Sequence, residues 1–208
     1  GKTDEKKEFL IRQSIRERGT ENYRQIGESR VASDRKLFFP VPDVKLWDLE
    51  NPVLYEVKTE LLQNGNVLDE NITLFGFRTA VFLQDGFYLN GKKVKLRGLN
   101  RHQSYPYVGY AMPESMQKRD ADILKNELGV NAVRTSHYPQ SRHFVERCDE
   151  LGLLVFTEIP GWQHIGDEIW KKQAVENVKD MVEQYRNHPS VIPVSYTHLR
   201  AHETRGNL

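Results

Sequence analysis

The chain has 208 residues, enough for one large domain or two small ones. Its 30 lysine and arginine residues almost balance its 29 aspartate and glutamate residues, and the net charge of +1 gives no indication of nucleic acid or an acidic membrane as partner. No apolar run approaches the length of a membrane span. The single cysteine, Cys148, excludes an internal disulfide, and its place on the apolar side of a predicted helix indicates a buried structural thiol.

The N-terminal part of the chain is predicted to be β structure. Residues 1–36 are polar and mixed in charge. Over 12–18, three arginines and a serine alternate with other residues, a pattern that permits an edge strand. A loose charged arm fits the same residues equally well. A strand is expected over 54–62, followed by the strong hairpin turn Asn64-Gly65 and a further strand over 72–81. This pattern is typical of a small antiparallel sandwich, or of the last part of one.

The pattern then changes to strands that alternate with helices. A hairpin with the turn Asn90-Gly91 is expected over 82–95, and a strand over 94–99 runs into the polar residues 100–102. Apolar residues at helical spacing predict a helix over 114–128. Polar residues at the end of a strand that leads to a helix are a first indication of an α/β fold with its site at the strand ends.

The stretch 131–156 contains one complete βαβ unit. An apolar run over 130–133 is followed by the polar residues 134–137, by a helical pattern that Gly152 ends, and by a second apolar run over 153–156. A further loop and an amphipathic helix follow, and a fourth strand is expected to begin at 190–192. These are three βα units and a fourth strand, less than half of the eight strands of a β/α barrel.

The βαβ stretch resembles the signature of the family 2 glycoside hydrolases, which include β-galactosidases, β-glucuronidases and β-mannosidases. The positions that carry the resemblance are Asn131, Val133, Arg134, Thr135, Ser136, His137, Tyr138, Pro139, Phe144, Val145, Asp149, Gly152 and the run Leu153 to Phe156. The resemblance implies the end of an immunoglobulin-like β-sandwich in residues 1–84. The first three βα units of a TIM (β/α)8 barrel, a catalytic domain, follow in residues 85–192.

The resemblance stops after Ile192. The family would continue to an Asn-Glu pair, whose glutamate is the general acid/base, and would supply the nucleophile glutamate further on. Residues 193–208 instead resemble a translated sequencing adaptor, and we predict that they are an artefactual tail. His198 and His202 have the spacing of two metal ligands on a helix but no third ligand, and nothing recommends Glu203 as the acid/base. We therefore expect no catalytic residue in this chain.

The resemblance implies that the site residues which this chain does contain bind the sugar rather than perform the chemical step. His102 and His137, at the ends of the first two barrel strands, are expected to bind substrate, since imidazole can donate to a hydroxyl near neutral pH. The alternative for each is a hydrogen-bonded packing residue. Arg134 is expected to orient acidic groups, with a structural ion pair as the alternative. Glu158 is expected to be a supporting carboxylate.

Four further residues complete the candidate set. Asn100 and Arg101 are expected to support the site, Trp162 is a candidate for sugar stacking or for packing, and His164 is placed in the same pocket. Some β-galactosidases of the family hold Mg²⁺ through a glutamate and a histidine of this loop. The loop over 161–164 has no such glutamate, so no metal or other cofactor is predicted here, and Mg²⁺ remains open for the parent enzyme.

The predicted function is that of a fragment of a retaining exo-glycosidase for terminal β-galactosides, inactive alone because such enzymes need two catalytic carboxylates. The motif Asn100-Arg101-His102 favours a β-galactosidase, whereas the turn over 158–161 is similar to β-glucuronidases, which stay an alternative. A non-catalytic carbohydrate-binding half barrel is a third interpretation, but it would leave residues 190–192 as an exposed edge strand.

The expected partner is a β-linked galactoside or another oligosaccharide, and a homo-oligomeric parent enzyme stays open. The N-terminus is charged and does not begin with methionine, which indicates a piece of a longer protein. The bacterial cytoplasm or periplasm is the expected compartment.

Overall fold

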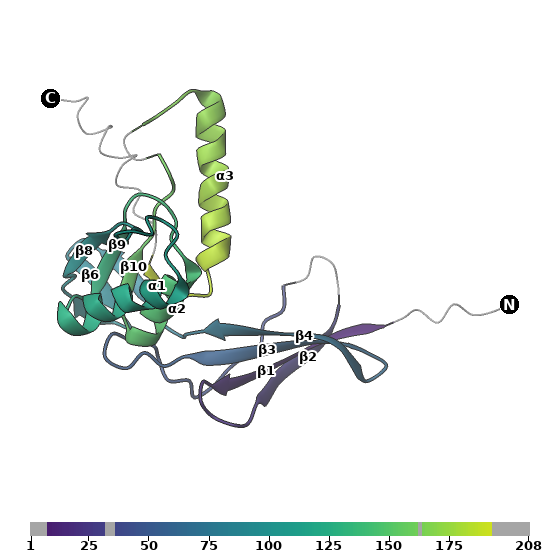
Figure 1. The fold of residues 1–208 in the computed structure, drawn as a ribbon. Coiled ribbons are helices and arrows are strands. Elements are labelled where there is room, and N and C mark those ends of the chain that lie inside the picture. The colour runs from purple at the N-terminus through teal and green to yellow at the C-terminus, as the bar shows by residue number, and fades with distance from the viewer. Residues whose placement is uncertain (1–7, 32–35, 162–163, 193–208) are drawn as a thin grey trace. The chain divides into compact units, whose positions relative to one another are not determined.

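The structure, a computed structural model, describes residues 8–31, 36–161 and 164–192 (Figure 1). The predicted tail lies outside these described residues. The chain forms two compact units. The first comprises Gly1–Lys45 and Val53–Phe77, and the second comprises Leu46–Pro52 and Arg78–Leu208.

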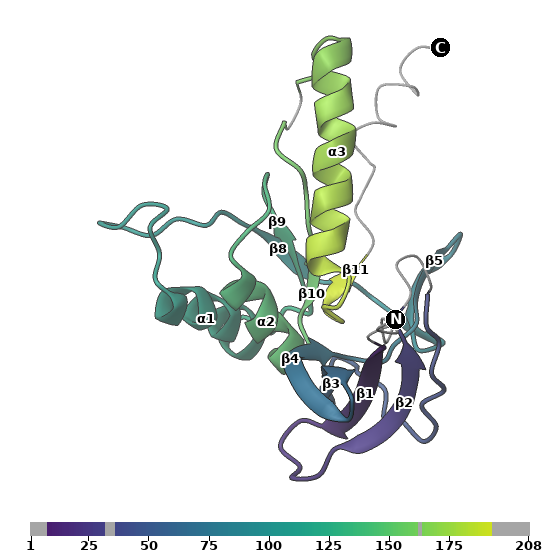
Figure 2. The ribbon, with the colours of Figure 1, turned by 90° about the vertical axis from the view of Figure 1, so that its right-hand side faces the viewer.

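The first unit contains a four-stranded antiparallel sheet in the order β2-β1-β3-β4, whose strands lie side by side in Figure 2. The predicted hairpin turn Asn64-Gly65 is confirmed. It joins β3 to β4, and its residues have φ values of 52° and 80°, as a type I′ turn requires. The strand bounds are β1 Phe9–Glu17, β2 Arg24–Arg30, β3 Tyr55–Gln63 and β4 Asn66–Phe75.

Strand β1 lies inside this sheet, so the predicted edge strand is wrong, as is a loose arm over residues 9–30. Pairing runs along both sides of β1, with β2 and with β3. Its charged residues meet opposite charges: Arg12 Nε lies 2.9 Å from Glu28 Oε2, and Arg16 Nη2 lies 2.6 Å from Glu56 Oε2. Because these cross-strand pairs satisfy the charges, the polar pattern is compatible with an interior strand.

A three-stranded antiparallel sheet, β5-β6-β7, belongs to the second unit, and its Asn90-Gly91 turn confirms the predicted hairpin. The strand expected over 72–81 is interrupted between β4 and β5, and the one expected over 94–99 is interrupted between β7 and β8. In both cases the two halves pair within different sheets, so one predicted strand becomes two. The bounds are β5 Ala80–Leu83, β6 Gly86–Leu89, β7 Lys92–Val94 and β8 Gly98–Arg101.

The main sheet of the second unit is parallel, in the order β11-β10-β9-β8. With β8, it comprises β9 Ala132–Thr135, β10 Leu154–Phe156 and β11 Val191–Ile192. The order of the strands in space follows their order in the chain, as it does for consecutive strands of a β/α barrel. The sheet therefore has the arrangement expected for the first strands of such a barrel.

Helices connect these parallel strands. After β8 come α1, Glu114–Asp122, and its π-helical continuation η1, Ile123–Glu127, which confirm the helix predicted over 114–128. Helix α2, Arg142–Leu151, lies between β9 and β10, and α3, Glu168–Tyr185, lies between β10 and β11. The predicted stop at Gly152 is confirmed, because its φ is 70° and a Cβ there would lie 2.5 Å from the Leu49 carbonyl oxygen.

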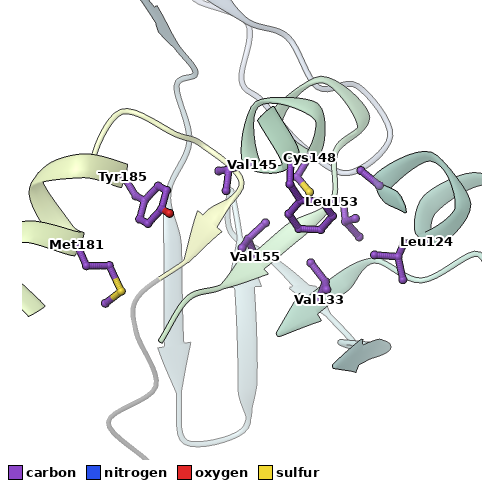
Figure 3. Packing of buried hydrophobic residues seen from close by; sticks show 10 residues of the cluster. Leu124, Val133, Val145, Cys148, Leu153, Val155, Met181 and Tyr185 are labelled. Atoms are coloured by element: carbon purple, nitrogen blue, oxygen red, sulfur yellow. The ribbon is translucent and has the colours of Figure 1, made fainter. Parts of the chain in front are cut away.

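The core of the second unit joins the parallel sheet to the helices (Figure 3). Its buried members are Ala121, Leu124, Val133, Phe144, Val145, Cys148, Leu153, Val155, Met181 and Tyr185. The Cys148 side chain has no exposed surface, and burial raises the pKa of its thiol well above the usual value. The thiol is therefore structural, as the sequence predicts.

Candidate functional site

Polar side chains gather at the carboxyl ends of three neighbouring parallel strands. His102 follows β8 directly, His137 stands two residues after β9, and Glu158 stands two residues after β10. Since these strands are neighbours in one sheet, their carboxyl ends lie at the same edge. In barrel enzymes this edge carries the active site.

Glu158 is the centre of this group. Only 7% of the residue is exposed, and its Oε2 lies 3.0 Å from His137 Nδ1. Its Oε1 accepts a hydrogen bond from Arg134 Nε. The side chains of His137 and Arg134 keep 27% and 32% of their surface exposed, so each contacts the buried carboxylate and is also accessible from the surface. The contact through Nδ1 fixes the orientation of the His137 ring.

His102 lies beside His137. The two ring centroids are 5.6 Å apart with an interplanar angle of 74°, an edge-to-face arrangement. The Tyr138 ring lies 6.3 Å from the His102 ring, and its hydroxyl accepts the backbone N–H of Gln103 at 3.0 Å. The structure thus brings together four predicted site residues, which are His102, Arg134, His137 and Glu158.

This group suits a ligand rich in hydroxyls, because imidazole and guanidinium groups donate and a carboxylate accepts hydrogen bonds. Both oxygens of Glu158 already have protein partners. This is typical of a supporting carboxylate, since a proton donor or nucleophile must be directed at the substrate. Among the described residues that directly follow these three strands, Glu158 is the one with a carboxylate side chain.

The remaining predicted residues lie in different surroundings. Asn100 is exposed on β8, in register with Arg134 of β9. Arg101 is 6% exposed and forms an ion pair of 2.7 Å with Asp120. Its place next to His102 and its burial fit the supporting role expected for it.

The loop after β10 is described in part. Trp162 lies outside the described residues, and its contact with sugar stays a prediction. His164 is exposed, and its ring lies edge-on to the ring of Trp170 with centroids 5.6 Å apart.

Three residues that join the two histidine-bearing segments are missing from the sequence prediction. Gln103, Tyr138 and Gln140 make hydrogen bonds between the segment after β8 and the segment after β9. Tyr138 follows His137 within the family signature, so its position could have indicated a role. The two glutamines carry no local signal, because their partners stand 38 and 39 positions away in the chain.

Within residues 8–31, 36–161 and 164–192, no group of three or more His, Cys, Asp and Glu side chains could hold a metal ion. The tail residues His198, His202 and Glu203 lie outside this range. The helices of the same range include none that is long and apolar enough to cross a membrane.

Comparison with known proteins identifies the family. A family model described as glycosyl hydrolases family 2, TIM barrel domain, matches residues 81–198, and one described as glycosyl hydrolases family 2 matches residues 1–78. The chain belongs to glycoside hydrolase family 2. The family and the fold class predicted from the sequence, a β-sandwich followed by the start of a TIM barrel, are thereby confirmed.

Its family 2 relatives include β-galactosidases and β-glucuronidases. A β-galactosidase from Thermoanaerobacterium thermosulfurigenes is 65% identical over 150 residues, which are 72% of this chain and 21% of that protein. A putative β-glucuronidase from Formosa agariphila is 41% identical over 157 residues, 74% of this chain and 19% of that protein. The chain therefore spans about a fifth of the length of these curated relatives.

Among solved structures, the FMN-binding β-glucuronidase from Facaelibacterium prausnitzii L2-6 matches with a TM-score of 0.79 and 34% identity. The match covers 88% of this chain and 28% of that one. The fold of this chain is thus shared with a β-glucuronidase, and its sequence is similar to a β-galactosidase as well.

Proposed function

We propose that this chain is part of a retaining exo-glycosidase that hydrolyses terminal β-galactosides. The observation that carries the proposal is the 65% identity to the β-galactosidase from Thermoanaerobacterium thermosulfurigenes over 72% of this chain. The group at the strand ends supports it, because two imidazoles and a guanidinium beside a buried carboxylate offer several hydrogen bonds to sugar hydroxyls.

Each residue of the group has a defined role in this proposal. His102 and His137 contact hydroxyls of the galactosyl group. Glu158 holds the His137 ring through Nδ1, and Arg134 holds Glu158 through Oε1. Asn100 is assigned a supporting role, and an additional sugar contact is assigned to Trp162.

The chemical step needs two carboxylates about 5–5.5 Å apart, one as proton donor and one as nucleophile. Glu158 is assigned to neither step, because both of its oxygens bind protein groups. The two catalytic glutamates of the family are proposed to stand outside the 208-residue chain, which is therefore inactive alone.

A β-glucuronidase is the second candidate. Its support is the TM-score of 0.79 with the β-glucuronidase from Facaelibacterium prausnitzii L2-6 and the 41% identity to the putative β-glucuronidase from Formosa agariphila. A glucuronide carries a carboxylate where a galactoside carries a hydroxymethyl group. An enzyme built for one of them is expected to discriminate against the other by charge.

The test compares nitrophenyl β-galactoside with nitrophenyl β-glucuronide, using the protein encoded by the complete source gene. The proposal predicts a kcat/KM at least about 100-fold higher for the galactoside, the scale on which a misfitting group is rejected. The reverse order selects the β-glucuronidase, and no turnover of either by the folded protein contradicts both. The 208-residue chain is expected to hydrolyse neither, and activity that persists through its purification would overturn that expectation.

The proposal assigns no metal or organic cofactor to the described part of the site. The complete protein is therefore also assayed in the presence of a chelator. Activity that is lost with the chelator and restored by Mg²⁺ would indicate a metal site completed by residues elsewhere in the enzyme.

A further inference from the structure

Arg101, the last residue of β8, is the centre of a buried hydrogen-bond network. Its side chain keeps 5% of its surface exposed. Nε and Nη2 donate to Asp120 Oδ2 at 3.0 and 2.7 Å, and Nη2 also donates to Gln117 Oε1 at 2.8 Å. The guanidinium carbon lies 4.0 Å from the centroid of the Phe144 ring. Side chains of α1 and α2 therefore enclose the guanidinium group.

The remaining arm of the guanidinium reaches Gln140, in the segment that follows β9. Nη1 donates to Gln140 Oε1, and Gln140 Nε2 donates back to the Arg101 carbonyl oxygen at 2.8 Å. The same carbonyl oxygen accepts the backbone N–H of Ser136 at 3.0 Å. The Gln140 carbonyl oxygen accepts the Tyr185 hydroxyl of α3 at 2.7 Å. Arg101 therefore ties the end of β8 to the segment after β9 through both its side chain and its backbone.

Each histidine of the site adjoins one of these anchors. His102 stands between Arg101 and Gln103, and the Gln103 Oε1 accepts the backbone N–H of Ser141 at 2.6 Å. His137 directly follows Ser136, which is bound to the Arg101 carbonyl. The two segments are thus joined on both sides of the histidine pair. Groups that contact a ligand keep a productive geometry only when their supporting residues are themselves held in place.

We propose that Arg101 is a positioning residue that, together with Gln140, sets the distance and angle between His102 and His137. This inference rests on the proposed function, which assigns the two histidines to the sugar. An arginine is needed because its planar fork lets Nε and Nη2 bind Asp120 while Nη1 binds Gln140, whereas the lysine ammonium is a single centre. A positive charge at position 101 is therefore not sufficient.

The test is NMR spectroscopy of the histidine rings in the 208-residue chain and in the Arg101→Lys variant, which keeps the charge and loses the fork. The unchanged chain should show a nuclear Overhauser effect between the ring protons of His102 and His137. Arg101→Lys should lose this effect and shift both ring signals. The matched control is Arg147→Lys, which alters an ion-paired arginine on α2 whose partners are Asp122 and Glu150, and it should leave both rings unchanged.

Three results would overturn the proposal. The effect could be missing from the unchanged chain, it could survive in Arg101→Lys with unmoved ring signals, or Arg147→Lys could disturb the rings equally. If Arg101→Lys does not fold, Gln140→Glu decides, because it keeps the acceptor for Nη1 and removes the donor to the Arg101 carbonyl oxygen. Loss of the ring–ring effect in Gln140→Glu supports the proposal, and its persistence contradicts it.

Titration of the same samples with a non-hydrolysable β-thiogalactoside separates this inference from the proposed function. Ring signals of His102 and His137 that respond to the sugar in the unchanged chain and not in Arg101→Lys support both. If neither ring responds in any sample, the assignment of the histidines to the sugar fails. The ring–ring effect still decides whether Arg101 positions them.

Discussion

The half-buried His188 and the buried Asp149 form a pair whose strength depends on pH. His188 Nδ1 lies 2.6 Å from Asp149 Oδ2, and Asp149 Oδ1 accepts the backbone N–H of Ser190 at 2.9 Å, just before β11. Burial by itself lowers the pKa of His188, but the hydrogen bond and charge of Asp149, with a contribution from Glu146, outweigh burial and raise it. Folding therefore favours the protonated imidazole.

We predict that Asp149→Asn destabilises the chain more at low pH than at high pH. A group whose pKa is raised by folding adds stability below its unfolded pKa of about 6.5, and this stability is lost as the pH rises through the folded pKa. The variant keeps an acceptor for Ser190 but replaces a charge-assisted hydrogen bond, worth about 1.5–3 kcal/mol, with a neutral one worth about 0.5–1.5 kcal/mol. The expected loss is therefore about 1–2 kcal/mol below the unfolded pKa of His188, and smaller well above its folded pKa.

Urea unfolding followed by tryptophan fluorescence measures this loss. Trp47 has no exposed surface and donates to the Asp149 carbonyl oxygen at 2.7 Å, so it reports on this part of the chain. The control is Asp122→Asn, whose ion-pair partner is Arg147 and whose cost should be the same at both pH values. Equal losses for Asp149→Asn at low and high pH, or a greater loss at high pH, would refute the coupling.

Three further substitutions or reactions test the packing. Phe144 has no exposed surface, so Phe144→Ala should lower the free energy of unfolding in urea by about 3–5 kcal/mol, and a loss below about 1 kcal/mol would contradict its core position. Arg78 donates to the carbonyl oxygens of Pro189 and Val191, so Arg78→Met should cost about 2–4 kcal/mol and speed amide exchange in β11. Unchanged exchange would show that Arg78 does not anchor that strand. The Cys148 thiol should resist a thiol reagent until the chain is unfolded, since burial raises its pKa; rapid labelling of the folded chain would contradict this.

Local patterns explain why some elements are predictable and others are not. The helix that Gly152 ends can be read from the sequence, because apolar spacing and a glycine with positive φ are properties of the segment itself. The interior position of β1 cannot be predicted in this way. Charged residues such as Arg12 and Arg16 are typical of a solvent-exposed segment, and their cross-strand partners are known only from the fold. The break between Phe75 and Ala80 is hidden for a similar reason: it marks a change of pairing partner, from β3 for β4 to β6 for β5, which only the folded chain shows.

The candidate site likewise has features that the sequence predicts and features that it does not. The sequence places His102, His137 and Glu158 together, because the carboxyl ends of neighbouring parallel strands meet at one edge. It does not reveal that His137 contacts Glu158 through Nδ1, or that Arg101 binds Gln140. Those contacts join residues 21 and 39 positions apart, and only the folded chain brings them within hydrogen-bond distance.

The anomeric form of the first sugar released tests the proposed reaction most directly. The protein encoded by the complete gene is mixed with nitrophenyl β-galactoside, and the product is observed by proton NMR before mutarotation equilibrates it. A retaining family 2 β-galactosidase releases β-galactose first, because two displacements at the anomeric carbon restore its configuration. Initial release of α-galactose would contradict retention, and the absence of galactose from a reaction with folded protein would contradict the galactosidase assignment itself.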